Sequence, residues 1–348
     1  MSGEWNRYGP SVARGRGASR RFACPDAIDM HGHVYVPEAD AALGSPAREA
    51  AVGIAPDTVV LNRRQNQERR PNMVDMALRL ADLDAMGLAR QVILPAPGQC
   101  FYGAEPTNAA RATRVLNDGI AELARRGEGR LLPFGSVPMQ EPELAVAELE
   151  RCVGELRFHG AEILTNVAGR EVSSPEFEPF WKRAAELRCL VVLHPTGFTQ
   201  PLRLGRFYDN NVIGNPLDTT LALHHLILDG VLERHPDLRL MAVHGGGYAA
   251  AYSGRLDHAW GARSDARASL PHPPSTYLSK VFFDTVVFDP RQLEFLVKVL
   301  GAEQILLGTD YPYDMADYDP LELLAAADLP DEVRHAIARD NACRLLAV

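Results

Sequence analysis

The sequence predicts an α/β fold, a closed (β/α)8 TIM barrel with an insertion after its first strand, on three observations. From residue 27 onward, short apolar runs alternate with longer amphipathic stretches. The apolar runs are continuous, which is typical of parallel strands that are buried on both faces. Eight strand–helix units follow one another, and a chain of 348 residues has the length of one such barrel.

The expected strands are short runs rich in Val, Ile and Leu, bounded by turn residues. They cover residues 27–33, 90–95, 131–137, 161–164, 190–194, 238–244, 281–285 and 304–308. A doubly wound open sheet gives similar local patterns, so these runs by themselves leave that alternative open.

Helical periodicity separates most of these strands. It covers residues 73–86, 108–125, 141–156, 174–187, 219–234, 291–300 and 331–346. The alternation breaks at residues 34–71, which show little periodicity. Because this long segment follows the C-terminal end of a strand, we expect it to form a cap or insertion over the active-site face of the barrel.

The domain organisation is expected to be a flexible N-terminal arm, residues 1–26, followed by one barrel domain, residues 27–348. The first 21 residues carry five arginines spread among Gly, Ser and Pro, a composition typical of a solvated arm. No apolar region follows Arg20 and Arg21 as an export signal requires. Five scattered cysteines without CxxC pairs indicate reduced, mostly buried thiols, and we expect a cytoplasmic protein.

Composition and motifs restrict the partners. The net charge of −9 argues against nucleic acid, and no apolar run approaches the roughly 18 residues of a membrane span. The sequence contains no P-loop, no GxGxxG after a strand and no GxSxG. The expected partner is therefore a small molecule rather than nucleic acid, membrane or a nucleotide cofactor.

Metal-competent side chains stand at the ends of four expected strands. His31 and His33 lie two residues apart on the first strand, so they project to the same side. His194 and His244 end two later strands, and Asp310 follows the last one. Because the C-terminal ends of barrel strands converge, these groups predict one metal site.

The remaining histidines are expected to be structural, because they fall near helix ends, on helices or in connections. They are His159, His224, His225, His235, His258, His272 and His335, of which His258, fourteen residues after His244, lies on a stretch that could line the active-site mouth.

The segments that hold these residues resemble the amidohydrolase-related decarboxylases, and within them the aminocarboxymuconate-semialdehyde decarboxylase branch. The resemblance runs from about residue 27 to residue 346 and implies a barrel of the metal-dependent hydrolase type. It is carried by Ile28-Asp29-Met30-His31-Gly32-His33, Val137-Pro138-Met139-Gln140-Glu141-Pro142-Glu143-Leu144-Ala145, His194-Pro195, Val243-His244-Gly245-Gly246-Gly247, Gly254-Arg255 and Leu307-Gly308-Thr309-Asp310-Tyr311-Pro312.

The resemblance implies roles for individual residues. His31, His33, His194 and Asp310 are the implied metal ligands, while His244 and Asp310 are the implied catalytic residues. An HxH motif, rather than ExH, favours Zn²⁺, with Mn²⁺ as the alternative. Arg255 is implied to bind the substrate carboxylate from the neighbouring subunit of a homodimer.

Two positions depart from the family pattern. Thr196 and Gly197 follow the His-Pro pair where family members have an aromatic residue. The substrate-binding arginine expected after the first strand has no single counterpart. The candidates are Arg63, Arg64, Arg69 and Arg70.

The expected function is non-oxidative decarboxylation of an unsaturated or aromatic carboxylic acid, with an arginine to bind the carboxylate. A hydrolase or hydratase acting on a ring-cleavage product is the alternative, since it needs the same metal and general acid or base. A non-catalytic scaffold barrel predicts the loss of some of these side chains, and all five positions are filled.

Overall fold

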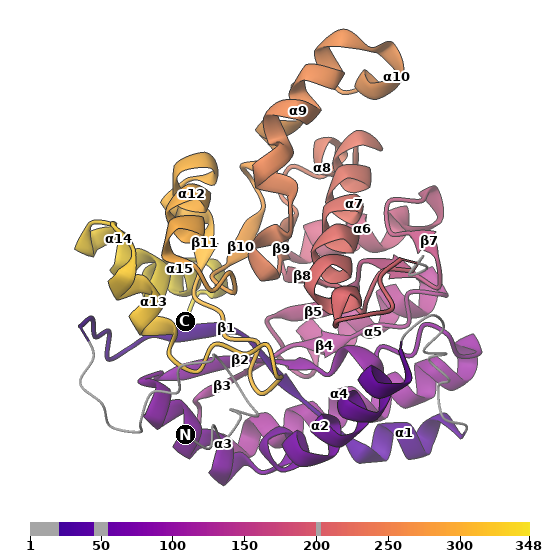
Figure 1. Cartoon of the computed structure of the whole chain (residues 1–348). Coiled ribbons are helices and arrows are strands. Elements are labelled where there is room, and N and C mark those ends of the chain that lie inside the picture. The colour runs from indigo at the N-terminus through magenta and orange to yellow at the C-terminus, as the bar shows by residue number, and fades with distance from the viewer. Residues whose placement is uncertain (1–20, 45–54, 200–202) are drawn as a thin grey trace.

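A computed structural model describes residues 21–44, 55–199 and 203–348 and contains the predicted barrel (Figure 1). Hydrogen bonding gives a sheet in the order β1-β2-β3 and a second in the order β11-β10-β9-β8-β5-β4, and all of these pairs are parallel. The strands are β1 Ile28–Val34, β2 Arg90–Pro95, β3 Leu131–Pro133, β4 Gly135–Ser136, β5 Gly160–Leu164, β8 Leu190–His194, β9 Arg239–Ala242, β10 Phe282–Asp284 and β11 Ile305–Leu306.

The two sheets join into a closed barrel. The single strand predicted over residues 131–137 is interrupted at Phe134, whose N–H still donates to the carbonyl of Ile93 on β2 at 3.1 Å. On the other side, the N–H of Met30 donates to Leu307 at 2.8 Å, and the N–H of Asp310 donates to His31 at 2.7 Å. Because the last strand thus pairs with the first, the open-sheet alternative is excluded.

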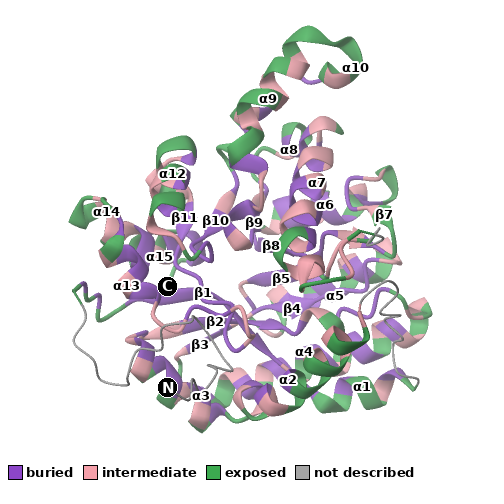
Figure 2. Cartoon of the chain, in the orientation of Figure 1, coloured by how far each residue is buried: buried purple, intermediate pink, exposed green. Residues whose placement is uncertain are grey.

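Helices surround the barrel, and their exposed residues face outward (Figure 2). The longer ones are α2 Pro56–Val74, α3 Met76–Met86, α4 Pro106–Arg126, α5 Pro142–Gly154, α6 Glu178–Leu187, α7 Asn215–Leu228, α9 Ala249–Ala262 and α12 Pro290–Leu300. The shorter ones are α1 Pro37–Leu43, α8 Val231–Arg234, α10 Ser264–Arg267, α11 Pro274–Leu278, α13 Pro320–Ala326, α14 Asp331–His335 and α15 Asn341–Leu346. A small antiparallel hairpin, β6 Asn166–Val167 with β7 Arg170–Glu171, lies outside the barrel.

Two apolar clusters support this architecture. The smaller one brings together residues of strands from different sides of the barrel, such as Ile28, Val92, Leu190 and Met241, with Leu345 of α15. Strands on opposite sides meet only through the interior, so this cluster fills the barrel. The larger cluster packs the outer faces of the strands against the helices.

The N-terminal boundary lies earlier than expected. Residues 1–20 of the expected arm lie outside the described residues, but Phe22 and Cys24 are buried, and the Phe22 ring lies 4.9 Å from that of His335. Residues 21–26 therefore pack against the barrel rather than belonging to a free arm. All five cysteines are free, as expected, and four of them are buried.

The insertion, residues 34–71, holds helix α1 and most of helix α2, with residues 45–54 outside the described part. Sequence periodicity missed α2 because it carries Asn, Gln and Arg on nearly every face and buries few side chains, namely Gln65, Arg69 and Met73. None of the described helices combines the length and the apolar character that crossing a membrane requires.

Candidate metal centre

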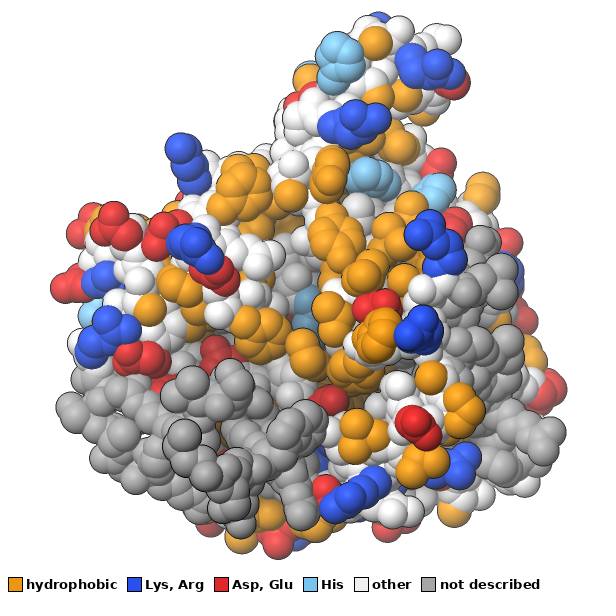
Figure 3. All heavy atoms as spheres, viewed as in Figure 1, with side chains coloured by type: hydrophobic (Ala, Val, Ile, Leu, Met, Phe, Trp, Pro, Cys, Tyr) orange, Lys and Arg blue, Asp and Glu red, His pale blue; other side chains and the backbone are white. Residues whose placement is uncertain are grey.

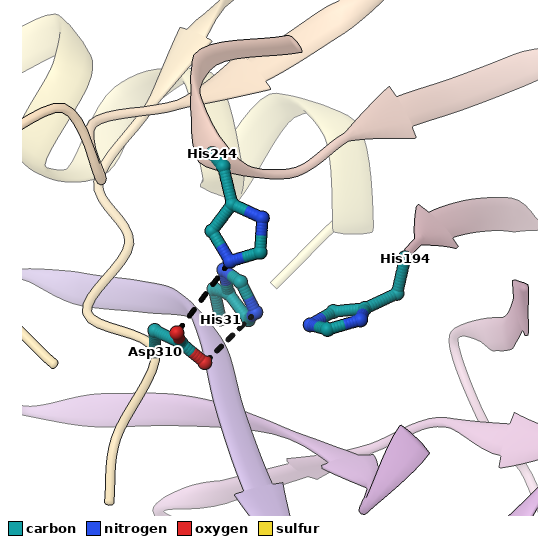
Figure 4. A group of neighbouring side chains, drawn as sticks. All are labelled: His31, His194, His244 and Asp310. Carbon is teal, nitrogen blue, oxygen red and sulfur yellow. Dashed lines mark ion pairs between the residues drawn. The ribbon is translucent and has the colours of Figure 1, made fainter. Parts of the chain in front are cut away.

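Four of the predicted residues meet at the C-terminal end of the barrel (Figure 4). His31 comes from β1, His194 ends β8, His244 follows β9, and Asp310 follows β11. One potential ligand atom of each lies within 4.8 Å of the others. An oxygen of Asp310 lies 3.6 Å from Nε2 of His31, and its other oxygen lies 3.5 Å from Nε2 of His244.

His33 belongs to the same cluster. Its Nε2 lies 3.0 Å from Nε2 of His31 and 3.3 Å from an oxygen of Asp310. Two nitrogens bound to one zinc ion, each about 2.0–2.1 Å from it, lie roughly 3.3 Å apart in tetrahedral geometry. The spacing of the two β1 histidines therefore fits a shared ion.

The outer ring nitrogens of three histidines are hydrogen bonded. Nδ1 of His31 lies 2.7 Å from a carboxylate oxygen of Asp284. Nδ1 of His33 lies 2.9 Å from the carbonyl oxygen of Pro95, and Nδ1 of His194 lies 2.7 Å from the carbonyl of the residue that follows it. Acceptors at Nδ1 place the proton there and leave a lone pair on Nε2, as in metal-binding histidines.

His244 differs from these three histidines. Within the described part of the chain, its Nδ1 is buried without a hydrogen-bond partner, and its side chain keeps 16% of its surface exposed. Nε2 of His194 is also buried without a partner among the described residues. A buried, unpaired ring nitrogen is costly, and a metal ion at the centre of the cluster would satisfy that of His194.

A strained turn presents His244. The φ angles of His244, Gly245, Gly246 and Gly247 are 56°, 61°, 71° and 64°. A Cβ on Gly247 would lie 2.1 Å from the carbonyl oxygen of Pro216. The glycines are therefore required by both conformation and space, which explains why they follow His244 in the sequence.

Burial and charge act in opposite directions on these groups. Burial would raise the pKa of Asp310, but hydrogen bonds from His244 and His33 and the charge of His31 hold it well below its usual range. Burial would lower the pKa of His31, but the Asp284 carboxylate and Asp310 raise it to about 9. The carboxylate of Asp310 is thus held ionised, the form in which a carboxylate can bind a metal ion.

A cavity of about 280 Å³ opens onto His194, His244 and Asp310. Helix α2 supplies part of its wall, including Asn62, Gln65 and Arg69. The remaining lining residues include many polar ones, among them Thr58, Asn66, Tyr208, Asn210, Asn211, Asn215 and Asp314.

Of the four candidate arginines on α2, only Arg69 lines this cavity. Its side chain is 3% exposed, its guanidinium lies over the ring of Tyr313, and Nη1 lies 3.5 Å from a carboxylate oxygen of Asp314. Arg63 and Arg64 are exposed, and Arg70 stacks on Tyr35.

The cavity does not include Arg255. This residue is exposed on α9, which projects with α10 away from the barrel as an arm (Figure 1). Within one subunit, the structure therefore does not bring Arg255 to the metal cluster.

Sequence reasoning missed Asp284 and Glu162. Asp284 ends β10, so the same strand-end argument that identified His194 could have found it. Glu162 lies inside β5, where its carboxylate is fully buried 3.9 Å from Nδ1 of His33, and burial raises its pKa well above the usual value. Nothing in its position in the sequence marked it.

Comparison with known proteins places the chain in a family. A family model described as amidohydrolase matches residues 28–348. The 2-amino-3-carboxymuconate-6-semialdehyde decarboxylase of Dictyostelium discoideum is 31% identical over 279 residues, covering 80% of this chain and 78% of the relative. A 2-keto-4-carboxy-3-hexenedioate hydratase of Sphingobium is 28% identical over 229 residues, covering 59% of this chain and 63% of the relative.

Among solved structures, the 5-carboxyvanillate decarboxylase of Novosphingobium aromaticivorans superposes with a TM-score of 0.82 at 22% identity, covering 93% of this chain and 96% of that protein. It was solved with manganese and 4-hydroxy-3-methoxy-5-nitrobenzoic acid.

The fold and the metal-competent cluster define a barrel of the metal-dependent hydrolase type. The chain belongs to the amidohydrolase family, and the expected resemblance to its decarboxylases is confirmed.

Proposed function

We propose that this protein is a metal-dependent, non-oxidative decarboxylase of an unsaturated or aromatic carboxylic acid. One juxtaposition supports the proposal most directly: a buried arginine, Arg69, lines the same cavity as the metal-competent cluster. Guanidinium groups match the planar geometry of carboxylates. The decarboxylase relative, which covers most of the chain, supports the same reaction class.

The proposed metal ligands are His31, His33, His194 and Asp310. Three imidazoles with acceptors at Nδ1 and one carboxylate suit Zn²⁺, and Mn²⁺ is the alternative. A divalent ion held there would supply Lewis-acid chemistry and would lower the pKa of water at the site.

The remaining steps fall to the protein's own side chains. Arg69 binds a carboxylate of the substrate and orients it toward the cluster. The bond between the ring or alkene carbon and its carboxylate breaks, CO₂ leaves, and the electron pair stays on the carbon. His244 delivers the proton that this carbon takes up, and the ionised Asp310, one oxygen of which lies 3.5 Å from Nε2 of His244, orients the imidazole.

We also propose that residues 34–71 act as a cap that limits the access of water. Helix α2 supports this role because it lines the cavity onto which the cluster opens. A cap over the site strengthens the electrostatic interactions inside it.

The proposed working unit is a homodimer in which Arg255 completes the partner's site. Its exposed position on the projecting arm fits a contact outside its own subunit. A two-fold interface uses the same surface twice, so each site would receive one arginine. The five free cysteines favour the reducing cytoplasm as its location.

Hydration of a ring-cleavage product is the second candidate function, favoured by the hydratase relative. One experiment separates the two: purified, metal-loaded protein is incubated with carboxylated aromatics, muconate semialdehydes and unsaturated keto acids. Release of CO₂, together with a product about 44 Da lighter than the substrate, supports decarboxylation. A product about 18 Da heavier, without CO₂, supports the hydratase and contradicts our proposal.

A further inference from the structure

A second cavity, of about 230 Å³, adjoins the first. It also opens onto His244 and Asp310, and it shares Asn211, Asn215 and Met315 with the first cavity. The two cavities therefore meet at the same catalytic groups. The volume of each cavity is below the roughly 300 Å³ that is the lower end of the range for ligand pockets, whereas their combined volume exceeds it.

The second cavity has an apolar wall. The connection from β10 to α12 supplies Val286, Val287 and Phe288, while Val212 and Tyr248 come from other elements. The described residues that line it include no Lys or Arg, in contrast to the first cavity with Arg69. Hydrophobic side chains gather on this face of the molecule, below the projecting arm (Figure 3).

Contacts with the residues around the metal cluster hold this apolar wall in place. The N–H of Val286 donates to Asp284 at 3.2 Å, and that carboxylate also binds Nδ1 of His31. Val287 lies so close to Gly245 that a Cβ there would meet its Cγ1 at 2.6 Å. Phe288 is held at φ 62°, an uncommon conformation for an aromatic residue. The apolar wall is thus fixed to the same framework as the metal cluster.

We propose that the substrate has two unlike ends that lie on opposite sides of the reacting carbon. Its anionic end faces Arg69, and an uncharged apolar substituent, an alkyl, alkoxy or alkenyl group, packs against Val286, Val287 and Phe288. This proposal rests on the decarboxylase function and names the substrate class for it. A simple benzoate or a substrate charged at both ends would leave the apolar wall without a ligand group.

The test uses the metal-loaded full-length protein and ortho-hydroxybenzoates that carry hydrogen, methyl, ethyl or propyl at the 4- or the 5-position. The quantity measured is the ratio of kcat/KM for each alkylated acid to that for the unsubstituted acid. At one of the two positions we expect a rise of about fourfold for each buried methylene, the equivalent of about 0.8 kcal/mol. A flat or falling ratio at both positions would overturn the proposal.

Two variants locate the effect. Phe288→Asn removes the aromatic ring with a residue that tolerates the positive φ of this position. Val287→Thr keeps the shape of the side chain and adds a hydroxyl group. Both should reduce the rise per methylene. Val60→Thr is the matched control, because Val60 is 66% exposed on α2 and lines neither cavity. An unchanged rise in both Phe288→Asn and Val287→Thr would place the apolar group elsewhere and overturn the assignment.

A separate measurement distinguishes failure of this inference from failure of the proposed function. Calorimetry on the same acids measures binding whether or not CO₂ is released. Affinity that rises with chain length in the absence of turnover would keep the two-ended site and reject the decarboxylase. Affinity independent of chain length, with turnover intact, would keep the decarboxylase and reject the two-ended site.

Discussion

One oxygen of Asp284 lies 2.7 Å from Nδ1 of His31, and its other oxygen accepts the backbone N–H of Gly245 at 2.9 Å. A single carboxylate at the end of β10 thus joins a proposed metal ligand on β1 to the turn that presents His244. Both partners are donors, so the site requires an acceptor on each side. An amide has only one oxygen and cannot serve both.

Asp284→Asn should weaken metal binding by about 10- to 100-fold, because His31 or Gly245 then faces an NH₂ group. Competition against a chromophoric chelator measures the metal Kd. Asp218→Asn is the matched control, since Asp218 is also buried but is bonded to Thr165 and Asn166. Equal metal affinity in the two variants would show that Asp284 does not position the site.

Removing either β1 histidine should abolish metal binding. His31→Ala and His33→Ala each delete an inward-facing Nε2 from the cluster. Metal content after dialysis, measured by elemental analysis, should fall close to zero in both variants. A full complement of metal in both would contradict the ligand assignment.

His244→Ala should keep its metal and lose activity by about 10²- to 10⁴-fold, the usual cost of removing a general acid or base. The missing acceptor at its Nδ1 sets His244 apart from the other three histidines. Metal content and kcat are measured on the same preparation. If the metal disappears with the imidazole, His244 is a ligand rather than a proton donor.

Arg69→Met should lower kcat/KM for a carboxylate substrate by about 10- to 150-fold, since a hydrogen bond to a charged group contributes about 1.5–3 kcal/mol. Arg69→Lys should recover only part of this loss, because an ammonium lacks the planar pair of donors. Arg63→Met, on the exposed side of α2, is the control and should behave as wild type. Equal activity of Arg69→Met and Arg63→Met would exclude Arg69 from substrate binding.

Mixing two inactive variants tests whether Arg255 acts across subunits. Arg255→Ala and His31→Ala homodimers should each be nearly inactive, whereas mixed dimers should regain one working site of the two. Subunit exchange is followed by native mass spectrometry alongside the assay. Absence of recovery in a sample with demonstrated exchange would rule out a site completed by the partner.

The site residues at the ends of apolar strands could be predicted from the sequence. His194 ends, and Asp310 follows, an apolar run typical of a buried parallel strand, so both their positions and their convergence could be predicted. Which arginine lines the cavity could not be predicted, because four arginines lie in one stretch and only the orientation of α2 decides that Arg69 is the buried one. The apolar cavity could not be predicted from the sequence either, because Val286, Val287 and Phe288 resemble the end of an ordinary strand.

The backbone N–H of Asp310 donates a hydrogen bond to the backbone carbonyl of His31, and these two residues lie far apart in the sequence. Ribosomal synthesis delivers the first of these residues long before the second, and contacts of such high sequence separation form late. A nascent chain therefore carries its pair of β1 histidines without the carboxylate that completes the centre. Under the proposed ligand assignment, the centre is completed only once β11 and Asp310 have been made, and a chain truncated before β11 should bind metal more weakly than the full-length protein.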